Sequence, residues 1–87
     1  MPRISFFYGI TIAMFWDESG HQTPHFHAAY AGQRASVGLD GTVLAGSLPP
    51  RALKLVRQWA SLHQAELLAN WRRARAQRPL CRIDPLA

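Results

Sequence analysis

Two histidines in the segment Pro24-His25-Phe26-His27 have the residue type and spacing to do chemistry. In a strand, His25 and His27 project from the same face, because alternate side chains point the same way. Imidazoles placed in this way could share an ion, contact a phosphate or exchange protons with a substrate. Such a pair suits metal-independent RNA cleavage, in which one histidine deprotonates the 2′-hydroxyl and the other protonates the leaving oxygen. Arg34, across the predicted hairpin, would stabilise the charge that develops on the phosphate.

Two other interpretations of the histidine pair stay open. Alternating histidines can begin a zinc site, but a catalytic zinc usually has three protein ligands. The third would have to come from Asp17, Glu18 or His21 in the preceding loop. Alternatively, the histidines are partly buried strand residues that hydrogen-bond to the backbone. We predict no metal site and no other cofactor.

A second candidate site is the arginine-rich C-terminal region. The chain has a net charge of +5 and a sequence pI near 10.7. This balance favours an anionic partner, either nucleic acid or an acidic protein. The alternative is a solvated helix end that only keeps the chain soluble. The arginines predicted to bind nucleic acid or a protein partner are Arg72, Arg73, Arg75, Arg78 and Arg82.

The first half of the chain has the pattern of a β-sheet. Runs of β-branched and aromatic residues predict strands, and the turn signals Ala31-Gly32 and Asp40-Gly41 separate three of them. Because these turns are short, neighbouring strands must be antiparallel. The predicted strands are 10–16, 25–30, 34–39 and 42–45.

The second half has the pattern of helices. Pro49 and Pro50 suit a first helical turn, and apolar residues at helical spacing follow them. One unbroken helix would bring Glu66 and Asn70 close to the apolar stripe, so we expect a break near His63. The predicted helices are 50–62 and 64–77.

The predicted fold is α+β, with an antiparallel β-meander of three to four strands followed by two helices packed on one face, a two-layer sandwich. We predict a single domain over residues 1–87, with a β-rich half at about 1–46, a helical half at about 49–77 and an extended basic tail at 78–87. Trp59 and Trp71 fall on the apolar stripe and are predicted core residues. Phe6, Phe7 and Tyr8 could stack on bases, but we expect them to pack under the edge of the sheet.

Cysteine content and hydropathy indicate a compartment. Cys81 is the single cysteine, so no intramolecular disulfide can form, which fits a reducing environment. The apolar run at residues 4–16 is shorter than the roughly 20 residues that span a bilayer. We predict a cytoplasmic protein that does not enter a membrane. The sequence leaves homo-oligomerisation open.

The blocks Pro2-Arg3-Ile4-Ser5, Pro24-His25-Phe26-His27-Ala28 with Tyr30, and Gly46-Ser47-Leu48-Pro49 carry a family resemblance. With them the chain resembles the small bacterial proteins grouped as domain of unknown function 4160. Ala29 departs from the family pattern, which often has an acidic residue there, so a site that includes that carboxylate is not carried over. The resemblance implies a short cytoplasmic protein encoded beside a second small protein. Such pairs look like toxin–antitoxin modules, with this family as the growth-inhibiting member.

We therefore hypothesise a toxin-like protein that acts on RNA or the translation machinery. His25, His27 and Arg34 are the candidate catalytic residues of a metal-independent ribonuclease. The expected partners are a cognate small antitoxin-like protein and RNA. One alternative is a non-enzymatic interaction protein, such as an antitoxin or a nucleic-acid-binding partner that uses the C-terminal arginines. The other is a small metal-binding domain.

Overall fold

Five strands followed by two helices form the fold, in a computed structural model that describes residues 2–15 and 23–87. The strands form an antiparallel meander in the order β1-β2-β3-β4-β5. The predicted α+β class is confirmed, with one strand more than the three to four expected. The elements are β1 Arg3–Phe7, β2 Ile10–Ala13, β3 His25–Tyr30, β4 Gln33–Gly38, β5 Val43–Gly46, α1 Pro50–Leu62 and α2 Gln64–Arg75.

β1 is the strand that the sequence did not predict. Its side chains do not alternate regularly, because the register shifts between Arg3 and Ser5 and leaves both Ile4 and Ser5 buried. An extra residue of this kind, a β-bulge, breaks the period of two that marks a strand. β2 ends at Ala13, earlier than predicted. Trp16, the last residue of that predicted strand, lies outside the described residues.

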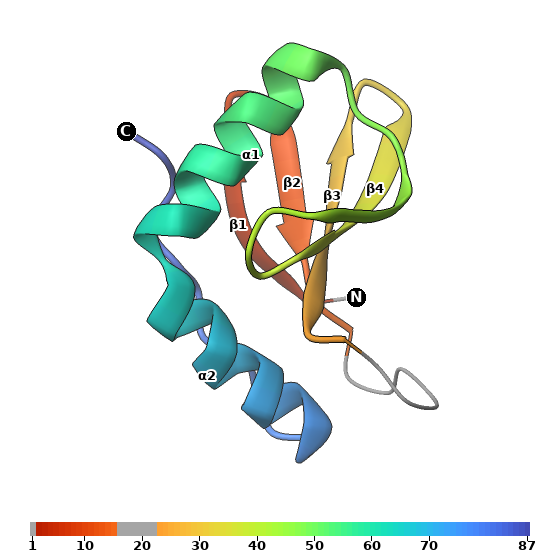
Figure 1. Cartoon of the computed structure of the whole chain (residues 1–87). Helices are drawn as coiled ribbons and strands as arrows, with labels where there is room; N and C mark the ends of the chain where they lie inside the picture. Colours follow the sequence, from red (N-terminus) through yellow and green to blue (C-terminus); the bar gives the residue numbers. More distant parts are fainter. Residues whose placement is uncertain (1, 16–22) are drawn as a thin grey trace.

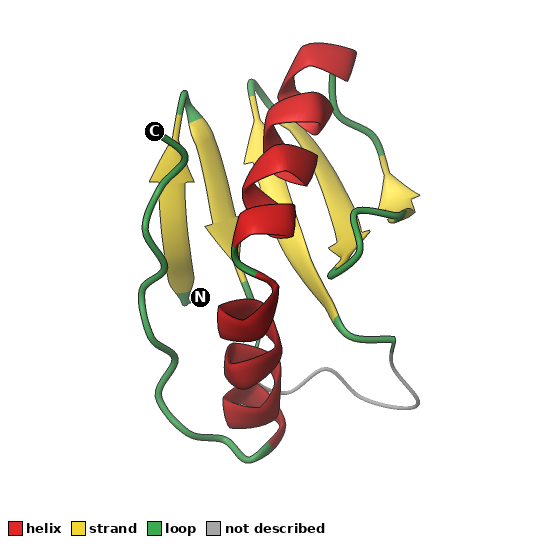
Figure 2. Cartoon of the chain, turned by 60° about the vertical axis from the view of Figure 1, so that its left-hand side comes forward, coloured by secondary structure: helices red, strands yellow, loops and turns green. Residues whose placement is uncertain are grey.

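α1 lies across one face of the sheet, α2 continues from it past the lower end of the sheet in Figure 1, and the core fills the space between the strands and the helices (Figure 1, Figure 2). Trp59 of α1 is fully buried at its centre, with its ring 5.4 Å from that of Phe7 and 5.7 Å from that of Phe26. Its indole N–H donates to the carbonyl oxygen of Asp84 at 2.8 Å. Trp59 and Trp71 are therefore core residues, as predicted.

The two helices meet at His63, where the predicted break is confirmed. His63 has φ −125° and ψ 29°, outside the helical range, and its Nδ1 lies 2.6 Å from Oε1 of Glu66. The break leaves Glu66 on the surface, but Asn70 is fully buried within α2. Among the helices that the structure describes, none is long and apolar enough to cross a membrane.

Asn70 is buried because it holds the C-terminal tail, residues 76–87. Its Nδ2 donates to the carbonyl oxygen of Cys81 at 2.8 Å, and its Oδ1 accepts the backbone N–H of Cys81 at 2.9 Å. Further along, the N–H of Ile83 donates to the carbonyl oxygen of Ile4 in β1 at 2.8 Å, and the Ile83 side chain is buried. The tail therefore runs along the outer edge of β1 and completes the core (Figure 2).

The turn between β4 and β5 fixes α1 from the other side. Arg57 Nε donates to the carbonyl oxygen of Gly41 at 2.9 Å, and Gly41 has φ 94°, a conformation that other residues rarely adopt. The backbone N–H of Thr42 donates to Asp40 Oδ1 at 2.9 Å, which holds the pKa of the Asp40 carboxyl below its ordinary value. The carboxylate therefore stabilises the turn at neutral pH, and this contribution is lost as the pH falls through that lowered pKa.

Candidate nucleic-acid interface

His27 lies on the face of the sheet that is turned away from α1, called the outer face below, and His25 begins β3 close to Trp71 of α2. The ring centroids of the two histidines are 5.1 Å apart. His25 is only 6% exposed, and its Nδ1 lies 2.7 Å from the carbonyl oxygen of Thr23. His27 is half-buried, and its Nδ1 lies 3.4 Å from Oγ of Ser36 on β4. The two histidines are therefore not equivalent, since His27 reaches the surface and His25 lies largely beneath it.

The strand register places four residues in one row across the outer face. Phe6 of β1 pairs with Thr11 of β2, Thr11 pairs with Ala29 of β3, and Ala29 pairs with Arg34 of β4. The row crosses three strand intervals, or about 14 Å. Small side chains occupy the two central strands, whereas Phe6 and Arg34 stand at the two rims.

A second row lies beside the first. Arg3 of β1 pairs with Ala13 of β2, Ala13 pairs with His27 of β3, and His27 pairs with Ser36 of β4. Here too a small residue occupies β2. The β1 rim of this row carries a second arginine, and the far side carries His27 and a hydroxyl.

Most residues of the two rows line a shallow pocket of about 300 Å³, called the outer-face trough below, and Phe6 and Ser36 lie beside it. Its volume is at the lower end of the range for ligand pockets, about 300–1,000 Å³. Of the described residues that line the trough, none is acidic and two are arginines. Guanidinium groups match the oxygens of a phosphate, so the trough can hold an anionic group between its rims. The lining residues are Arg3, Thr11, Ala13, Phe15, His27, Ala28, Ala29 and Arg34.

A series of ring contacts connects the trough to α2. The Phe15 ring lies edge-on to His27 at 4.4 Å, and on the other side of His27 the His25 ring lies 5.3 Å from that of Trp71. The guanidinium carbon of Arg75 lies 6.0 Å from the Trp71 ring centroid. Because buried rings are close-packed, Trp71 and His25 together restrict the orientation of His27.

The structure brings His27 and Arg34 together but does not bring the C-terminal arginines into the trough, since none of the five lines it. Arg73 is half-buried, and its Nη1 donates to Oδ1 of Asn70 at 3.0 Å. Arg72, Arg75, Arg78 and Arg82 are exposed on α2 and the tail. These arginines form a second basic region.

Arg3 and Phe15 were not predicted as site residues from the sequence, and Phe6 was predicted on the wrong side of the sheet. Of the three neighbouring aromatic residues, Phe7 packs under the sheet as predicted. The same prediction is wrong for Phe6 and Tyr8, which are 49% and 60% exposed. A signal for Phe6 was present, because adjacent residues of a strand must face opposite sides. Arg3 had no such signal, since the bulge in β1 hides its direction.

A metal site was one of the alternatives for the histidine pair. In residues 2–15 and 23–87, no group of three histidine, cysteine or acidic side chains is placed to hold a metal ion. The residues named as sources of a third ligand, Asp17, Glu18 and His21, lie outside the described residues. The described part of the chain therefore offers two neighbouring histidines and no third ligand.

A comparison with protein families found one that fits this chain. The model of the Domain of unknown function (DUF4160) matches residues 9–72, well over half of the sequence. The chain belongs to the DUF4160 family. No curated protein and no solved structure matched it. In this DUF4160 protein the matched range contains the trough residues of β2, β3 and β4, whereas Arg3, Phe6 and most of the tail lie outside it.

Proposed function

We propose that this DUF4160 protein is the growth-inhibiting toxin of a toxin–antitoxin pair, and that it acts in the cytoplasm by binding RNA in the outer-face trough. The observation that carries RNA as the target is the placement of Arg3 and Arg34 on opposite rims of a trough whose described lining contains no acid. The toxin role rests on the family resemblance drawn from the sequence.

Electrostatics and shape both favour a nucleic acid strand in the trough. Contacts between arginine and phosphate release counterions, which supplies much of the affinity of proteins for nucleic acids. The net charge of +5 draws a polyanion toward the whole molecule. Thr11, Ala13 and Ala29 leave room above the two central strands, so a sugar or base can lie between the rims.

The proposal includes metal-independent cleavage of the bound strand. His27 would take the proton of a 2′-hydroxyl, whose oxygen then bonds to phosphorus as the bond from phosphorus to the 5′-oxygen breaks. Arg34 would stabilise the charge on the phosphate, and solvent would protonate the leaving oxygen. Because His25 is largely buried against Trp71, we assign it a positioning role for His27 in place of the catalytic role predicted from the sequence.

The expected partner is a small protein that neutralises the toxin. An acidic segment of such a partner would place carboxylates on Arg3 and Arg34, the groups that we propose to hold phosphates. Partner and RNA would then compete for the same surface, and the partner would silence the toxin without entering the core.

Replacing Arg3 and Arg34 together with glutamine is expected to weaken RNA binding about tenfold or more, because two phosphate contacts are lost. The measurement is the fluorescence anisotropy of a short, labelled, unstructured RNA at several salt concentrations. The slope of log K against log salt should fall by about 1.4, since each phosphate contact on a single strand contributes about 0.7. In growing bacteria, the wild-type protein should arrest growth and the double variant should not.

The matched control replaces Arg72 and Arg75 with glutamine, which removes the same charge from the exposed face of α2. We expect this variant to bind RNA nearly as tightly as the wild type. Thermal unfolding must first show that both variants fold. If the α2 variant loses binding and the trough variant keeps it, the alternative of an interaction protein that uses its C-terminal arginines replaces our proposal.

The cleavage part of the proposal has its own test. With a chelator present, the wild-type protein should cut RNA and leave 2′,3′-cyclic phosphate ends, and His27→Ala should slow cleavage by about a hundredfold or more. RNA affinity and melting temperature should stay close to wild type. If the wild-type protein leaves RNA intact, ribonuclease activity is ruled out and a toxin that acts by binding RNA is left.

A further inference from the structure

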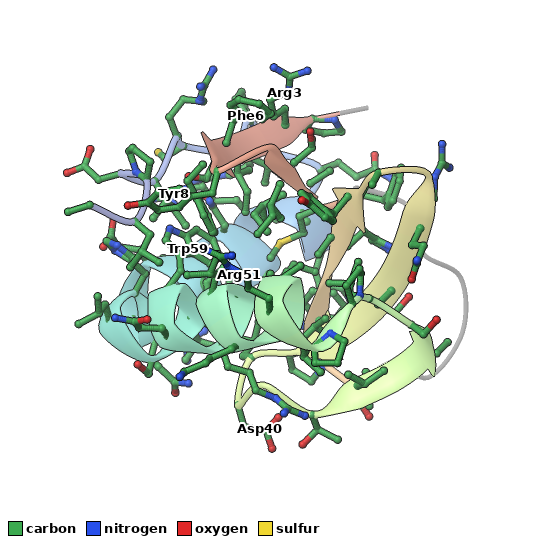
Figure 3. The ribbon with its side chains drawn as sticks, turned by 90° about the horizontal axis from the view of Figure 1, so that it is seen from above. Arg3, Phe6, Tyr8, Asp40, Arg51 and Trp59 are labelled. Carbon is green, nitrogen blue, oxygen red and sulfur yellow. The ribbon has the colours of Figure 1, made fainter. Side chains whose placement is uncertain are left out.

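Phe6 is a large aromatic side chain at the β1 rim of the outer-face trough. It is 49% exposed, whereas Ile4 and Phe7 on the same strand are buried. Its register partner is Thr11, which lies on the trough floor. Figure 3 shows Phe6 and Arg3 on the side of β1 that is turned away from α1, whereas Trp59 lies between α1 and the sheet. The ring of Phe6 is therefore presented at the surface beside the trough and is not part of the core.

Arg3 links this ring to the trough. Its guanidinium carbon lies 5.6 Å from the centroid of the Phe6 ring, a cation–π distance, and the Arg3 side chain also lines the trough. The contact restrains both side chains at the same rim. Proteins that bind single strands combine these two elements, cations that follow the phosphates and aromatic rings on which bases stack.

The shape of the trough selects the form of the nucleic acid. The floor between the rims is made of the small side chains Thr11, Ala13 and Ala29, so an unpaired base can approach the sheet. In an A-form duplex the bases are paired and stacked on one another, and no base face is available to a protein ring. We propose that the trough takes single-stranded RNA and stacks one base on Phe6, an inference that rests on the proposed function.

The test compares one RNA sequence as a single strand and as a duplex, with Phe6→Leu as the main variant. The leucine keeps an apolar side chain but has no aromatic face. We expect the wild type to prefer the single strand about tenfold or more, and Phe6→Leu to lose about tenfold in affinity for the single strand with little change for the duplex. A 2-aminopurine base in the strand should be quenched on binding to the wild type and not on binding to Phe6→Leu.

Two further variants serve as controls. Phe6→Tyr keeps the aromatic face and should restore both the affinity and the quenching. Tyr8→Ala removes an exposed ring that lies beyond the end of β1, where its hydroxyl donates to the carbonyl oxygen of Ala87, and should leave both unchanged. Wild-type affinity and quenching in Phe6→Leu, or equal binding of duplex and single strand, would overturn the inference. If Arg3→Gln with Arg34→Gln still abolishes binding in that case, the proposed function stands and only the stacking is wrong.

Discussion

Asn70→Leu is expected to lower the free energy of unfolding by about 2–4 kcal/mol. The substitution keeps the branched skeleton of the side chain but removes both hydrogen bonds to the backbone of Cys81. A polar group left without a partner on burial costs about 1–3 kcal/mol, and here a donor and an acceptor are both affected. For a domain of this size the melting temperature should fall on the order of 15 °C. Denaturant unfolding and thermal unfolding both measure the change.

Cys81→Ala is the matched control, because Asn70 bonds to the backbone of Cys81 and the thiol is exposed. We expect it to unfold like the wild type. Asn70→Asp keeps the acceptor but turns a second oxygen toward the carbonyl oxygen of Cys81 in a buried site, so it should also destabilise the protein. In Asn70→Leu, hydrogen exchange at Ile83 should accelerate, since its N–H bond to β1 depends on the position of the tail. A leucine variant as stable as Cys81→Ala would show that the hydrogen bonds from Asn70 to the tail contribute nothing to stability.

Ala29→Glu is expected to abolish RNA binding in the trough while the protein stays folded, and because family members often carry an acidic residue at this position, the binding mode proposed for this chain would not extend to them. Ala29 lies on the trough floor directly opposite Arg34 in the strand register, so a glutamate there places a carboxylate beside that guanidinium. The carboxylate forms an ion pair with the Arg34 guanidinium and repels phosphates from the floor of the trough. We expect an affinity loss of about a hundredfold, the sum of a lost contact and a new repulsion. Anisotropy with the same labelled RNA measures it.

Two controls separate the possible causes of such a loss. Ala29→Gln has nearly the same size without the charge, so it reports how much of the effect comes from filling the trough. Ala65→Glu makes the same change in net charge on the exposed surface of α2, away from the trough lining, and should lower affinity only slightly. If Ala65→Glu weakens binding as much as Ala29→Glu, RNA responds to overall charge and the trough is not its site.

Much of the fold could be predicted from the sequence because its signals are local. The turns at Ala31-Gly32 and Asp40-Gly41 and the break at His63 depend on a few adjacent residues, and the structure has all of them. Asn70 shows the limit of such reasoning. A buried asparagine conflicts with a helical apolar stripe, and its explanation lies in the backbone of Cys81, which only the tertiary fold brings beside it.

Part of the candidate site could also be predicted, because its sequence signals are local. His25 and His27 share a face by the period of a strand, and Arg34 follows across a short hairpin. The difference between the two histidines depends on Trp71, which comes from α2 and packs on His25. Arg3 reaches the trough through the register of β1 against β2, which the bulge shifts by one residue. No pattern within either segment shows that shift.

The position of the tail on β1 has a consequence for biosynthesis. The meander can form hairpin by hairpin as the nascent chain leaves the ribosome, because each strand pairs with the one made just before it. The contact between Ile4 and Ile83 joins residues that are far apart in the sequence, and it can form only after Ile83 has left the ribosome. At ordinary translation rates the outer edge of β1 therefore stays uncovered for on the order of several seconds. A chain that ends after α2 has every strand and both helices but lacks the tail segment that covers the core beside β1.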